Sequence, residues 1–449
     1  MHSAKLTMAK FLPVFFVACG FQMTAIAQEN SPYSRYGLGD LTPNHNIFSR
    51  GMGGIAAGVI DYQSINFVNP ATLASLPNTI FDIGAEADTR TLKSINPVKK
   101  YNSANAIFSY LQLAFPVATE RMRRKNIGWG MSFGLKPVSR INYKIETFSR
   151  LNNIDSINTL YEGSGGANQA YLGTAFKIKG FSFGINAGYM FGNKNYNTRL
   201  SFINDTIPYY KANYAHQTNF GGLFISGGIM YETVLNKDKK TEVPKVLRFG
   251  AYGNLKQKLT ASRDDIRETF SYDANNSSYR IDSISDQTGI SGTIEYPSSY
   301  TVGFSYTSEH WMFGVDYEAT KWSNYRYYGQ ADAVQNNSMV RVGIQYYPAK
   351  LNTPIKNYFS FVRYRAGFYY GPDYIKTTTN RPEYGFSFGT GMPLTSLQRL
   401  SYGGEYVVLN TALEIGGRGD KNSNIRENTL RFSFGVSMNA RWFRKLKYD

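Results

Sequence analysis

Residues 430–442 constrain the fold more than any other stretch, because apolar and small or polar side chains alternate there without exception. The apolar set consists of Leu430, Phe432, Phe434, Val436, Met438, Ala440 and Trp442. A helix would scatter these residues around its circumference, whereas a strand places all of them on one face. At about 3.3 Å per residue the stretch is roughly 40 Å long, enough to cross an apolar layer of about 25 Å when tilted. The pattern predicts a membrane-spanning strand.

The same alternation recurs along the chain and predicts fourteen strands. They are expected at 79–90, 103–115, 126–146, 167–178, 181–202, 211–233, 245–262, 293–307, 311–325, 336–347, 358–370, 383–391, 397–415 and 426–442. Connections alternate between short turns and longer loops, and the longest loops are expected at 147–166 and 263–292. Short turns at one end and long loops at the other are typical of outer-membrane barrels. We therefore predict an all-β fold, a 14-stranded antiparallel transmembrane β-barrel over residues 79–443, with both termini in the periplasm.

The first 27 residues predict export from the cytoplasm. Lys5 and Lys10 supply positive charge before a mostly apolar run at 11–23, and Ala25 and Ala27 supply the small residues of a cleavage site. This predicts a signal peptide over residues 1–27; the alternatives are an N-terminal anchor, for which the run is too short, and lipidation of Cys19. Cys19 is the only cysteine, so the mature chain is expected to lack disulfides and thiol chemistry.

Residues 28–78 show no sustained alternation and are rich in glycine and proline. A loose leader of this length would be unusual, and a segment folded into the barrel lumen would have a packing partner. We expect an N-terminal hatch, or plug, in preference to a disordered tail.

The formal net charge of +17 raises the question of an acidic partner. Nucleic acid is the generic partner of such a charge, but the signal peptide argues against it. Basic clusters fall at 121–125, 237–240 and in the tail at 444–449, all at the end of the barrel where short turns are expected. Outer-membrane lipid headgroups at the periplasmic rim are the simplest partner for these clusters.

Candidate catalytic residues are few. Beyond the signal peptide the histidines are His45, His216 and His310, which lack the spacing of metal ligands. The run Gly163, Ser164, Gly165 and Gly166 lacks the strand-turn-helix context of a hydrolase nucleophile. We predict no enzyme activity, no metal and no cofactor.

The N-terminal region resembles a known family. Residues 31–39 resemble the mature start of outer-membrane proteins of the Bacteroidota, which are Gram-negative. Residues 50–56, followed by Asn66 and the run Asn69, Pro70 and Ala71, resemble the hatch of the FadL family of long-chain fatty-acid and hydrocarbon transporters. The resemblance also covers the tail at 441–448, and the barrel through its strand number. It implies hatch positions at Gly53, Gly54, Asn69, Pro70 and Ala71.

The FadL resemblance further implies a lateral wall opening made by a kinked third strand. Lys136, Pro137 and Val138 are the candidates here, because a proline removes a ladder hydrogen bond and favours a bulge or break. The alternative is that the strand ends and restarts at this point. An interrupted wall near residues 136–139 is therefore expected.

Charged residues on the face opposite the apolar one are expected to point into the lumen. They are Arg248, Asp316, Glu318, Arg341, Arg363, Arg365, Glu405 and Arg431. Paired charges that grip the hatch are the simple expectation. The alternative is that some of the arginines hold the carboxylate headgroup of a ligand, for which a guanidinium is suited.

Two functions remain open from the sequence. The first is passive uptake of hydrophobic small molecules, such as long-chain fatty acids or hydrocarbons, through the plugged barrel and its lateral opening. The alternative is a PorV-like non-transporting barrel that scaffolds or shuttles protein partners in secretion or surface assembly. A continuous apolar tunnel would favour uptake, whereas a polar, plugged lumen with exposed aromatic residues on the segments 147–166 and 263–292 would favour the scaffold.

Overall fold

The structure is a computed structural model. It describes residues 31–95, 98–150, 156–203, 210–237, 243–275, 277–349, 357–377, 379, 381–395 and 405–440. The expected signal peptide, residues 28–30 and the segment 441–449 with the basic tail lie outside these ranges.

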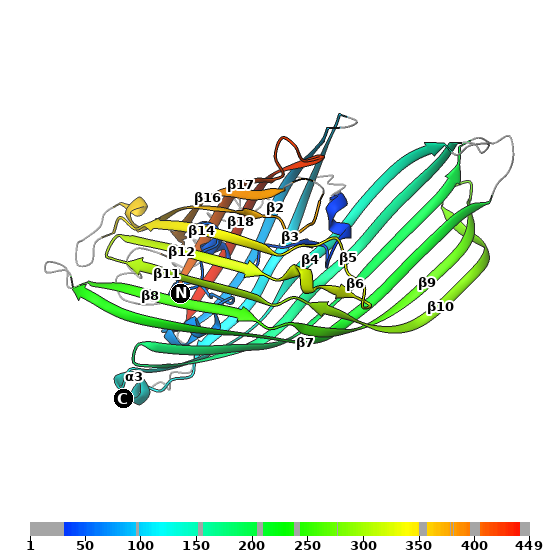
Figure 1. The fold of residues 1–449 in the computed structure, drawn as a ribbon. Helices are drawn as coiled ribbons and strands as arrows, with labels where there is room; N and C mark the ends of the chain where they lie inside the picture. Colours follow the sequence, from blue (N-terminus) through cyan, green and yellow to red (C-terminus); the bar gives the residue numbers. More distant parts are fainter. Residues whose placement is uncertain are drawn as a thin grey trace, which may run out of the picture.

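The chain forms a closed, 14-stranded antiparallel barrel, as the alternation predicted (Figure 1). The wall closes where β18 pairs with β2, from Thr79 opposite Ala440 to Ser94 opposite Ile425. Two wall strands are each interrupted once. β8 and β9 are two parts of one wall strand, because both pair with β7. β10 and β11 are two parts of the next wall strand, because β10 pairs with β9 and β11 pairs with β8. β1 and β13 are two-residue strands outside this count.

The wall strands have the following bounds: β2 Thr79–Ser94, β3 Lys99–Pro116, β4 Ile127–Arg150, β5 Ser156–Ile178, β6 Phe181–Phe202, β7 Lys211–Lys237, β8 Pro244–Asn254, β9 Gln257–Tyr272, β10 Ser278–Tyr296, β11 Ser299–Thr307, β12 Trp311–Thr320, β14 Asn337–Tyr346, β15 Arg363–Pro372, β16 Pro382–Pro393, β17 Tyr406–Arg418 and β18 Ile425–Ala440. The short elements are η1 Pro32–Arg35, β1 Asp40–Leu41, α2 Ile47–Arg50, η2 Pro70–Ser75, α3 Glu120–Arg124, η3 Trp322–Asn324, β13 Arg326–Tyr327 and η4 Tyr358–Phe361.

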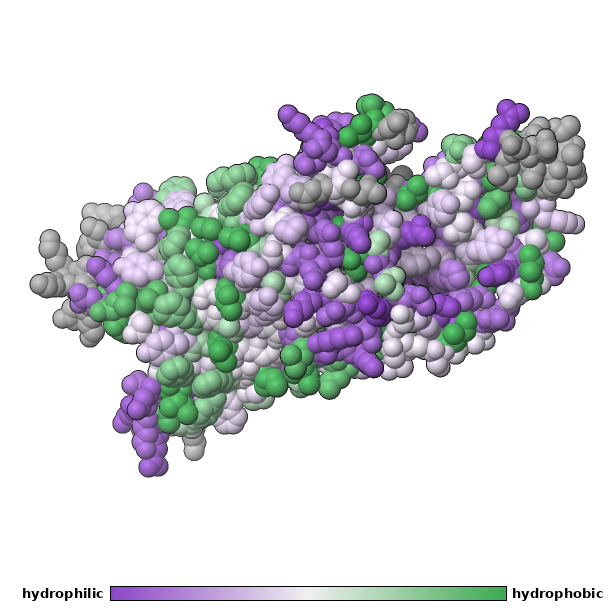
Figure 2. All heavy atoms as spheres, viewed as in Figure 1, coloured by the Kyte–Doolittle hydropathy of each residue, from purple (hydrophilic) through white to green (hydrophobic). Residues whose placement is uncertain are grey.

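The outer face of the wall carries the apolar set, as β18 shows. Phe432 and Phe434 are 48% and 46% exposed, whereas Ser433 between them is fully buried. Hydrophobic residues gather over the part of the molecule that carries β8, β11 and β12, and hydrophilic residues dominate its middle (Figure 2). An apolar outer band on a closed barrel is the architecture of outer-membrane proteins.

One side of the wall runs well beyond the other, and we call this part the extension. It consists of β9, β10 and the adjoining ends of β4, β5, β6 and β7, and it lies opposite the end that carries α3 (Figure 1). The prediction of long loops at 147–166 and 263–292 was wrong, because most of these residues lie in strands of the extension. Both segments continue as hairpins, because β4 reaches Arg150 before β5 begins at Ser156, and β9 reaches Tyr272 before β10 begins at Ser278.

Three expected strands differ from the observed ones at their ends. Residues 322–324 form η3 rather than the end of a strand, and residues 358–361 form η4 before β15 begins. β17 begins at Tyr406, and the preceding segment 396–404 lies outside the described residues. At the first two places a short 3-10 turn forms, so β12 ends earlier and β15 begins later than the alternation alone suggests.

Residues 31–78, which we call the N-terminal segment, are largely buried and pack against the inner side of the wall. α2 contacts β16, β17 and β18, and η2 contacts β4, β5, β6 and β7. The segment therefore spans from one side of the wall to the other. None of the described helices has the length and apolar character needed to cross a membrane.

Candidate functional site

Arg50, at the end of α2, is the strongest link between the N-terminal segment and the wall. Its guanidinium donates to Glu414 on β17 at 2.7 Å and also pairs with Glu86 on β2. The Arg50 side chain is 1% exposed, and Glu86 and Glu414 are also buried. A buried charge flanked by two carboxylates is stabilised only while all three stay together, so this triad holds α2 against the closing strands of the barrel.

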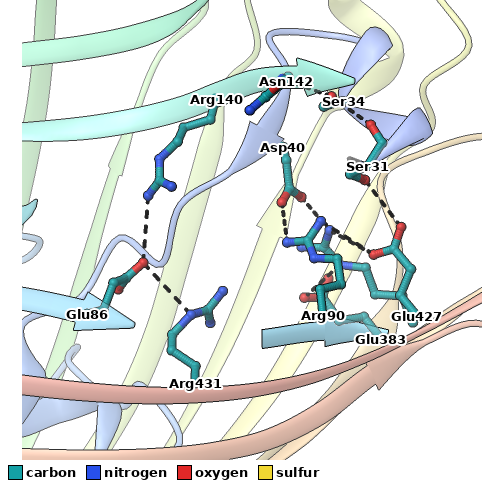
Figure 3. A network of polar contacts seen from close by, with 12 residues as sticks. Ser31, Ser34, Asp40, Glu86, Arg90, Arg140, Asn142, Glu383, Glu427 and Arg431 are labelled. Carbon is teal, nitrogen blue, oxygen red and sulfur yellow. Dashed lines mark hydrogen bonds and ion pairs between the residues drawn. The ribbon is translucent and has the colours of Figure 1, made fainter. Parts of the chain in front are cut away.

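A second network holds the start of the segment (Figure 3). Asp40 pairs with Arg90 at 2.6 Å and with Arg418 at 2.5 Å. Glu427 accepts a hydrogen bond from Ser31 at 3.3 Å and pairs with Arg381 at 3.0 Å. Glu86 also lies 3.8 Å from both Arg140 and Arg431, which links this network to the Arg50 triad. The N-terminal segment is therefore fixed to β2 and β17 by ion pairs at two levels and to β18 by the Ser31 hydrogen bond.

The expected hatch positions Gly53 and Gly54 form a tight turn against β14 to β16. Their φ angles are +68° and +83°, a region that glycine adopts without strain. The Gly53 amide donates to Ser387 Oγ at 2.7 Å, and its carbonyl accepts from Arg341 at 3.1 Å. The role of these glycines as a hatch stays a prediction, but a side chain at Gly53 would overlap the backbone of Val342 on β14 and Phe368 on β15.

Asn69, Pro70 and Ala71 form the start of η2 on the opposite side of the lumen. Asn69 caps this helix, accepting from the Ala71 amide at 3.1 Å, and donates to the Ala57 carbonyl at 2.6 Å. A side chain at Gly184 or Gly228 would overlap Pro70 or Asn69. These wall glycines allow the segment to approach the strands directly.

The expected lumen arginines lie inside the barrel, and each has a polar partner. Arg248 pairs with Glu232 at 2.6 Å, and Arg341 pairs with Glu318 at 3.1 Å. Arg363 pairs with Asp61 of the N-terminal segment at 2.9 Å. These pairs fit the simple expectation of matched charges.

Two further lumen arginines also belong to shared networks. Arg365 donates to Gln345 and Asn410, each at 2.9 Å, and stacks over the Phe48 ring. Arg431 lies 3.7 Å from Glu414. The structure does not bring Glu405 to this set, because Glu405 is exposed and immediately precedes β17. Asp316 instead accepts the amides of Ala56 and Ala57, at 2.6 and 2.8 Å.

A cavity of about 230 Å³ remains between the segment and the wall. Its lining combines polar and charged side chains with apolar and aromatic ones such as Phe67, Val68, Met190, Phe224 and Trp322; the charged side chains and the histidine are His45, Arg50, Arg90, Lys136, Glu318, Arg341, Glu383, Glu414, Arg418 and Arg431. Within the described residues, no group of three or more His, Cys, Asp or Glu side chains is placed to hold a metal ion. A lining of this kind suits a molecule that has both a polar or charged group and an apolar part.

The wall between β3 and β4 is paired over a short distance only. The ladder runs from Pro116 opposite Gly130 to Leu111 opposite Leu135 and ends there. On the other side of β4, the ladder with β5 has a register shift between Pro137 and Ser139. Beyond Leu135 the described part of β4 diverges from β3, and we call the space between them the wall gap.

The N-terminal segment covers the β4 side of the wall gap. β1 pairs Leu41 with Ser139 and Asp40 with Arg140. The Thr42 amide donates to the Val138 carbonyl at 3.1 Å, and the Thr42 hydroxyl donates to the Pro137 carbonyl at 3.0 Å. The edge of β4 that β3 leaves is therefore hydrogen-bonded from inside the barrel.

Lys136 lies beside this break and faces inward. Its ammonium donates to Asn44 Oδ1 and lies 4.7 Å from the centre of the Phe67 ring. An open hollow at the gap is lined by Ile107, Phe108 and Pro137, with backbone of Gly165 and Gly166. The three candidate opening residues thus lie where the described wall ladders are interrupted.

Sequence reasoning missed an aromatic cluster that covers the lumen from the extension side. Lys194 on β6 donates to the Gly37 carbonyl at 2.7 Å, and its ammonium lies 4.5 Å from the centre of the Tyr327 ring. Tyr325 donates to the same carbonyl at 2.9 Å. The surrounding buried core includes Leu38, Phe220, Phe224, Trp322, Tyr325 and Tyr374. Aromatic residues beyond the membrane strands were the only available signal, and they have no periodic pattern.

Comparison with known proteins places the chain. The family model BamG matches residues 8–449. The chain belongs to the BamG family. None of the curated proteins matches the sequence.

Solved structures similar to this BamG-family barrel are channels and transporters. A Pseudomonas aeruginosa FadL homologue has a TM-score of 0.54 at 12% identity and covers 90% of this chain and 100% of its own. The CymD monoaromatic hydrocarbon channel has a TM-score of 0.51 at 15% identity, with 91% and 100% covered. The Pseudomonas putida toluene transporter TodX has a TM-score of 0.50 at 15% identity, with 90% and 100% covered. At these identities the likeness shows that the fold is FadL-like.

Proposed function

We propose that this BamG-family barrel is an outer-membrane scaffold that binds protein partners at the cell surface through its extension. The observation that carries the proposal is the combination of a lumen locked by buried ion pairs with strands that run far beyond the membrane band. In this proposal both termini face the periplasm, on the side opposite the extension, where β18 ends.

The ion pairs argue for a fixed N-terminal segment. Withdrawing α2 from the lumen would separate Arg50 from Glu86 and Glu414. Leaving a buried charge without its partner costs about 3–5 kcal/mol. The Asp40 network adds a second barrier of the same kind. A gate that opened by moving this segment would have to overcome both.

The tip of the β9–β10 hairpin carries exposed apolar residues. Tyr272, Tyr279, Ile281 and Ile284 are 38%, 53%, 45% and 67% exposed. They lie in the segment 263–292, where exposed aromatic residues favour a scaffold over an uptake channel. Clustered aromatic and branched side chains outside the membrane band are characteristic of protein interfaces.

A double variant, Tyr279→Ser with Ile284→Ser, tests the proposal. Cross-linking in intact cells, followed by purification of the tagged barrel, measures the yield of partner polypeptides. We expect the yield to fall at least about tenfold, as for interface residues worth about 2 kcal/mol or more. Phe148→Ser, 67% exposed on the opposite edge of the extension, is the matched control. An unchanged partner yield in the double variant would exclude the hairpin as the docking surface.

A second function, uptake of hydrophobic small molecules such as long-chain fatty acids or hydrocarbons, is favoured by the wall gap. The interrupted ladders at Leu135 and Pro137 are where a lateral exit of a FadL-like channel would lie. The Pseudomonas putida structure of this fold is a toluene transporter. Lys136, Pro137 and Val138 would then border the exit, and a lumen arginine such as Arg341 would face the headgroup.

Closing the gap separates the two functions. Phe108→Cys combined with Pro137→Cys, joined by a short bifunctional cross-linker, would bridge the gap in a mature chain that is expected to lack cysteine. Uptake of a labelled fatty acid by intact cells should fall to the level of cells without the barrel if this route is used. Uptake that is unaffected by the bridge would remove the second function. The single-cysteine variants serve as controls.

A further inference from the structure

The β3 side of the wall gap has a free strand edge. β3 pairs with β2 along its length, from Ala114 opposite Ile80 to Lys99 opposite Ser94. Its ladder with β4 covers only the part from Leu111 to Pro116. Over residues 99–110, the described neighbours of β3 therefore supply backbone partners from one side alone. This edge is roughly 40 Å long at about 3.3 Å per residue.

The two edges of the gap differ in how they are covered. Residues 31–42 of the N-terminal segment hydrogen-bond to the β4 edge at Pro137, Val138 and Asn142. No described residue does the same for the gap side of β3. An unpaired backbone edge is open to a further strand, because its amide and carbonyl groups have no partner in the described wall.

A second free edge in the same molecule shows how this chain protects an edge that faces water. β10 pairs with β13 at Ile294 and Glu295, and Tyr328 donates to the Thr293 and Ile290 carbonyls, so residues 278–289 border solvent on one side. Its ladder with β9 contains three register shifts, and it carries the charges of Arg280, Asp282 and Asp286. Bulges and charges are the usual devices that prevent another strand from pairing with an edge.

Between Tyr101 and Phe108 the β3 edge lacks these devices, because its bulge and its lysines lie at the two ends. The single register shift between β2 and β3 leaves Ser109 unpaired at one end, and Lys99 and Lys100 lie at the other. From Tyr101 to Phe108 the sequence has no proline and no charged residue, and small side chains dominate it. A regular, unprotected edge is a template for a further strand.

We infer that residues 99–110 of β3 accept an extended segment of a partner polypeptide as an added antiparallel strand. The inference rests on the proposed scaffold function and names the type of contact that the gap makes. All ladders of the barrel are antiparallel, so the added strand runs against β3 and its C-terminal end lies at Lys99. Main-chain hydrogen bonds supply the affinity in strand addition, and side-chain pockets supply specificity.

Charge at the tip of the β2–β3 hairpin indicates the end of the partner strand. Lys93 and Lys100 lie directly opposite each other, and Lys99 follows at the exposed tip. Like charges directly opposite each other destabilise a strand pair. A carboxylate at the C-terminal end of the added strand would neutralise them. The partner segment is therefore extended, with small or apolar residues beside Phe108 and an acidic end beside Lys100.

A second copy of this chain fits the edge less well. Two copies inserted in the membrane in the same direction present β3 to each other in parallel. The antiparallel ladder used throughout the barrel would not form between them. Self-pairing is therefore an outcome that the test distinguishes.

Site-specific photo-cross-linking in the native outer membrane tests the inference. A photoreactive phenylalanine analogue is placed singly at Asn102, Ala104 and Ala106, three positions with the same side-chain parity along the edge. The controls are Ser283 and Gln287 on the protected β10 edge. We expect all three probes to cross-link to one segment of one partner. Each move of the probe by two residues toward the C-terminus of β3 should move the linked position in the partner by about two residues toward its N-terminus. Links to lipid, to a second copy, to scattered positions, or none at all would overturn the inference.

Adjacent prolines provide an independent readout. Neighbouring residues of a strand direct their amides to opposite sides. Of the two variants Ala104→Pro and Asn105→Pro, one therefore removes an amide donor that faces β2 and the other removes a donor that faces the gap. We expect the gap-facing variant to leave the thermal stability of the barrel unchanged and to reduce cross-linking from Ala106 at least tenfold. Equal cross-linking in both variants would contradict strand addition.

The charge requirement is tested with Lys99→Glu and Lys100→Glu together. We expect a several-fold loss of cross-linking from Asn102, and unchanged cross-linking would remove the acidic end from the inference. Partner recovery through the β9–β10 hairpin is measured separately. If hairpin variants still abolish recovery while the β3 positions give no links, the scaffold function stands and the β3 inference fails. If neither surface retains a partner, both fail.

Discussion

The two halves of the wall differ in strand length. β12, β14 and β15 each have 10 residues, which agrees with the roughly 9–11 residues that a tilted strand needs to cross a membrane. β4, β5, β6 and β7 have 24, 23, 22 and 27. The short strands have about the length that a membrane requires, and the long strands exceed it; under the proposed function this excess carries the partner-binding surface. The N-terminal segment contacts both halves: α2 packs against β16, β17 and β18, whereas η1, β1 and η2 pack against strands from β4 to β7.

The largest effect is expected from Arg50→Met, which breaks the link between α2 and the seam. Two buried carboxylates, Glu86 and Glu414, would lose their shared cation. We expect the free energy of unfolding to fall by about 3–5 kcal/mol. Urea-dependent loss of the heat-resistant folded band in detergent measures it. Arg50→Lys, which keeps the charge, should restore part of the loss; equal losses in both variants would contradict the ion-pair explanation.

A smaller effect is expected where the segment touches the short half through backbone. A Cβ at Gly343 on β14 would overlap the Met52 carbonyl oxygen, whereas a Cβ at Gly227 on β7 has its nearest neighbour 3.8 Å away. Gly343→Ala should cost about 1–3 kcal/mol, the usual cost of overpacking, and Gly227→Ala much less. The same unfolding measurement compares the two. Similar losses would show that the segment is not tightly seated against β14.

Removing the end of the extension is expected to leave the barrel nearly as stable as before. Residues 264–289 can be replaced by an Asn-Gly turn, because Arg263 and Ile290 are directly paired. We expect a change of less than about 1 kcal/mol, because this hairpin contributes little to the buried core. Unfolding in detergent measures the effect on stability. A large loss would mean that the extension is part of the barrel's folding core and that the two halves are not separable.

The smallest effect is expected at the surface of the extension. His216 lies 2.7 Å from Asp265, and the two side chains are 49% and 21% exposed. After allowing for solvent screening, His216→Ala should change the free energy of unfolding by no more than about 0.5 kcal/mol. Thermal unfolding compared with the parent chain provides the measurement. A loss of several degrees would indicate that the extension is cooperatively coupled to the barrel.

Sequence alone predicted the number of wall strands and the membrane-facing alternation well and the β9–β10 hairpin poorly, and the reason is solvent. Along β18 one face meets the apolar layer and the other the lumen, so Phe432 and Ser433 alternate in type. Along β10 both faces meet water, and most residues from Ser278 to Gly289 are exposed. Without a contrast between faces, a strand leaves no alternation in the sequence.

The sequence predicted which residue types would face the lumen, but it did not predict which residues would form ion pairs with them. Inward arginines such as Arg341 and Arg363 followed from strand parity. Their partners did not, because Asp61 lies in a segment without periodicity and Arg50 is separated from Glu414 by 364 residues. Pro137 marked the irregular place on β4, but the length of the gap depends on where β3 stops pairing, which no residue of β3 signals.

The Arg50 triad also sets an order for folding. α2 is made near the beginning of the chain, whereas Glu414 and the seam strand β18 are made last. The carboxylate that neutralises Arg50 from β17 is absent until nearly all of the polypeptide has been delivered. Contacts of such long sequence separation form slowly, because the loop between them must be closed first. Closing the cylinder and sealing its lumen should therefore be a single late event, and a chain truncated before β17 should remain an open sheet with its N-terminal segment unsecured.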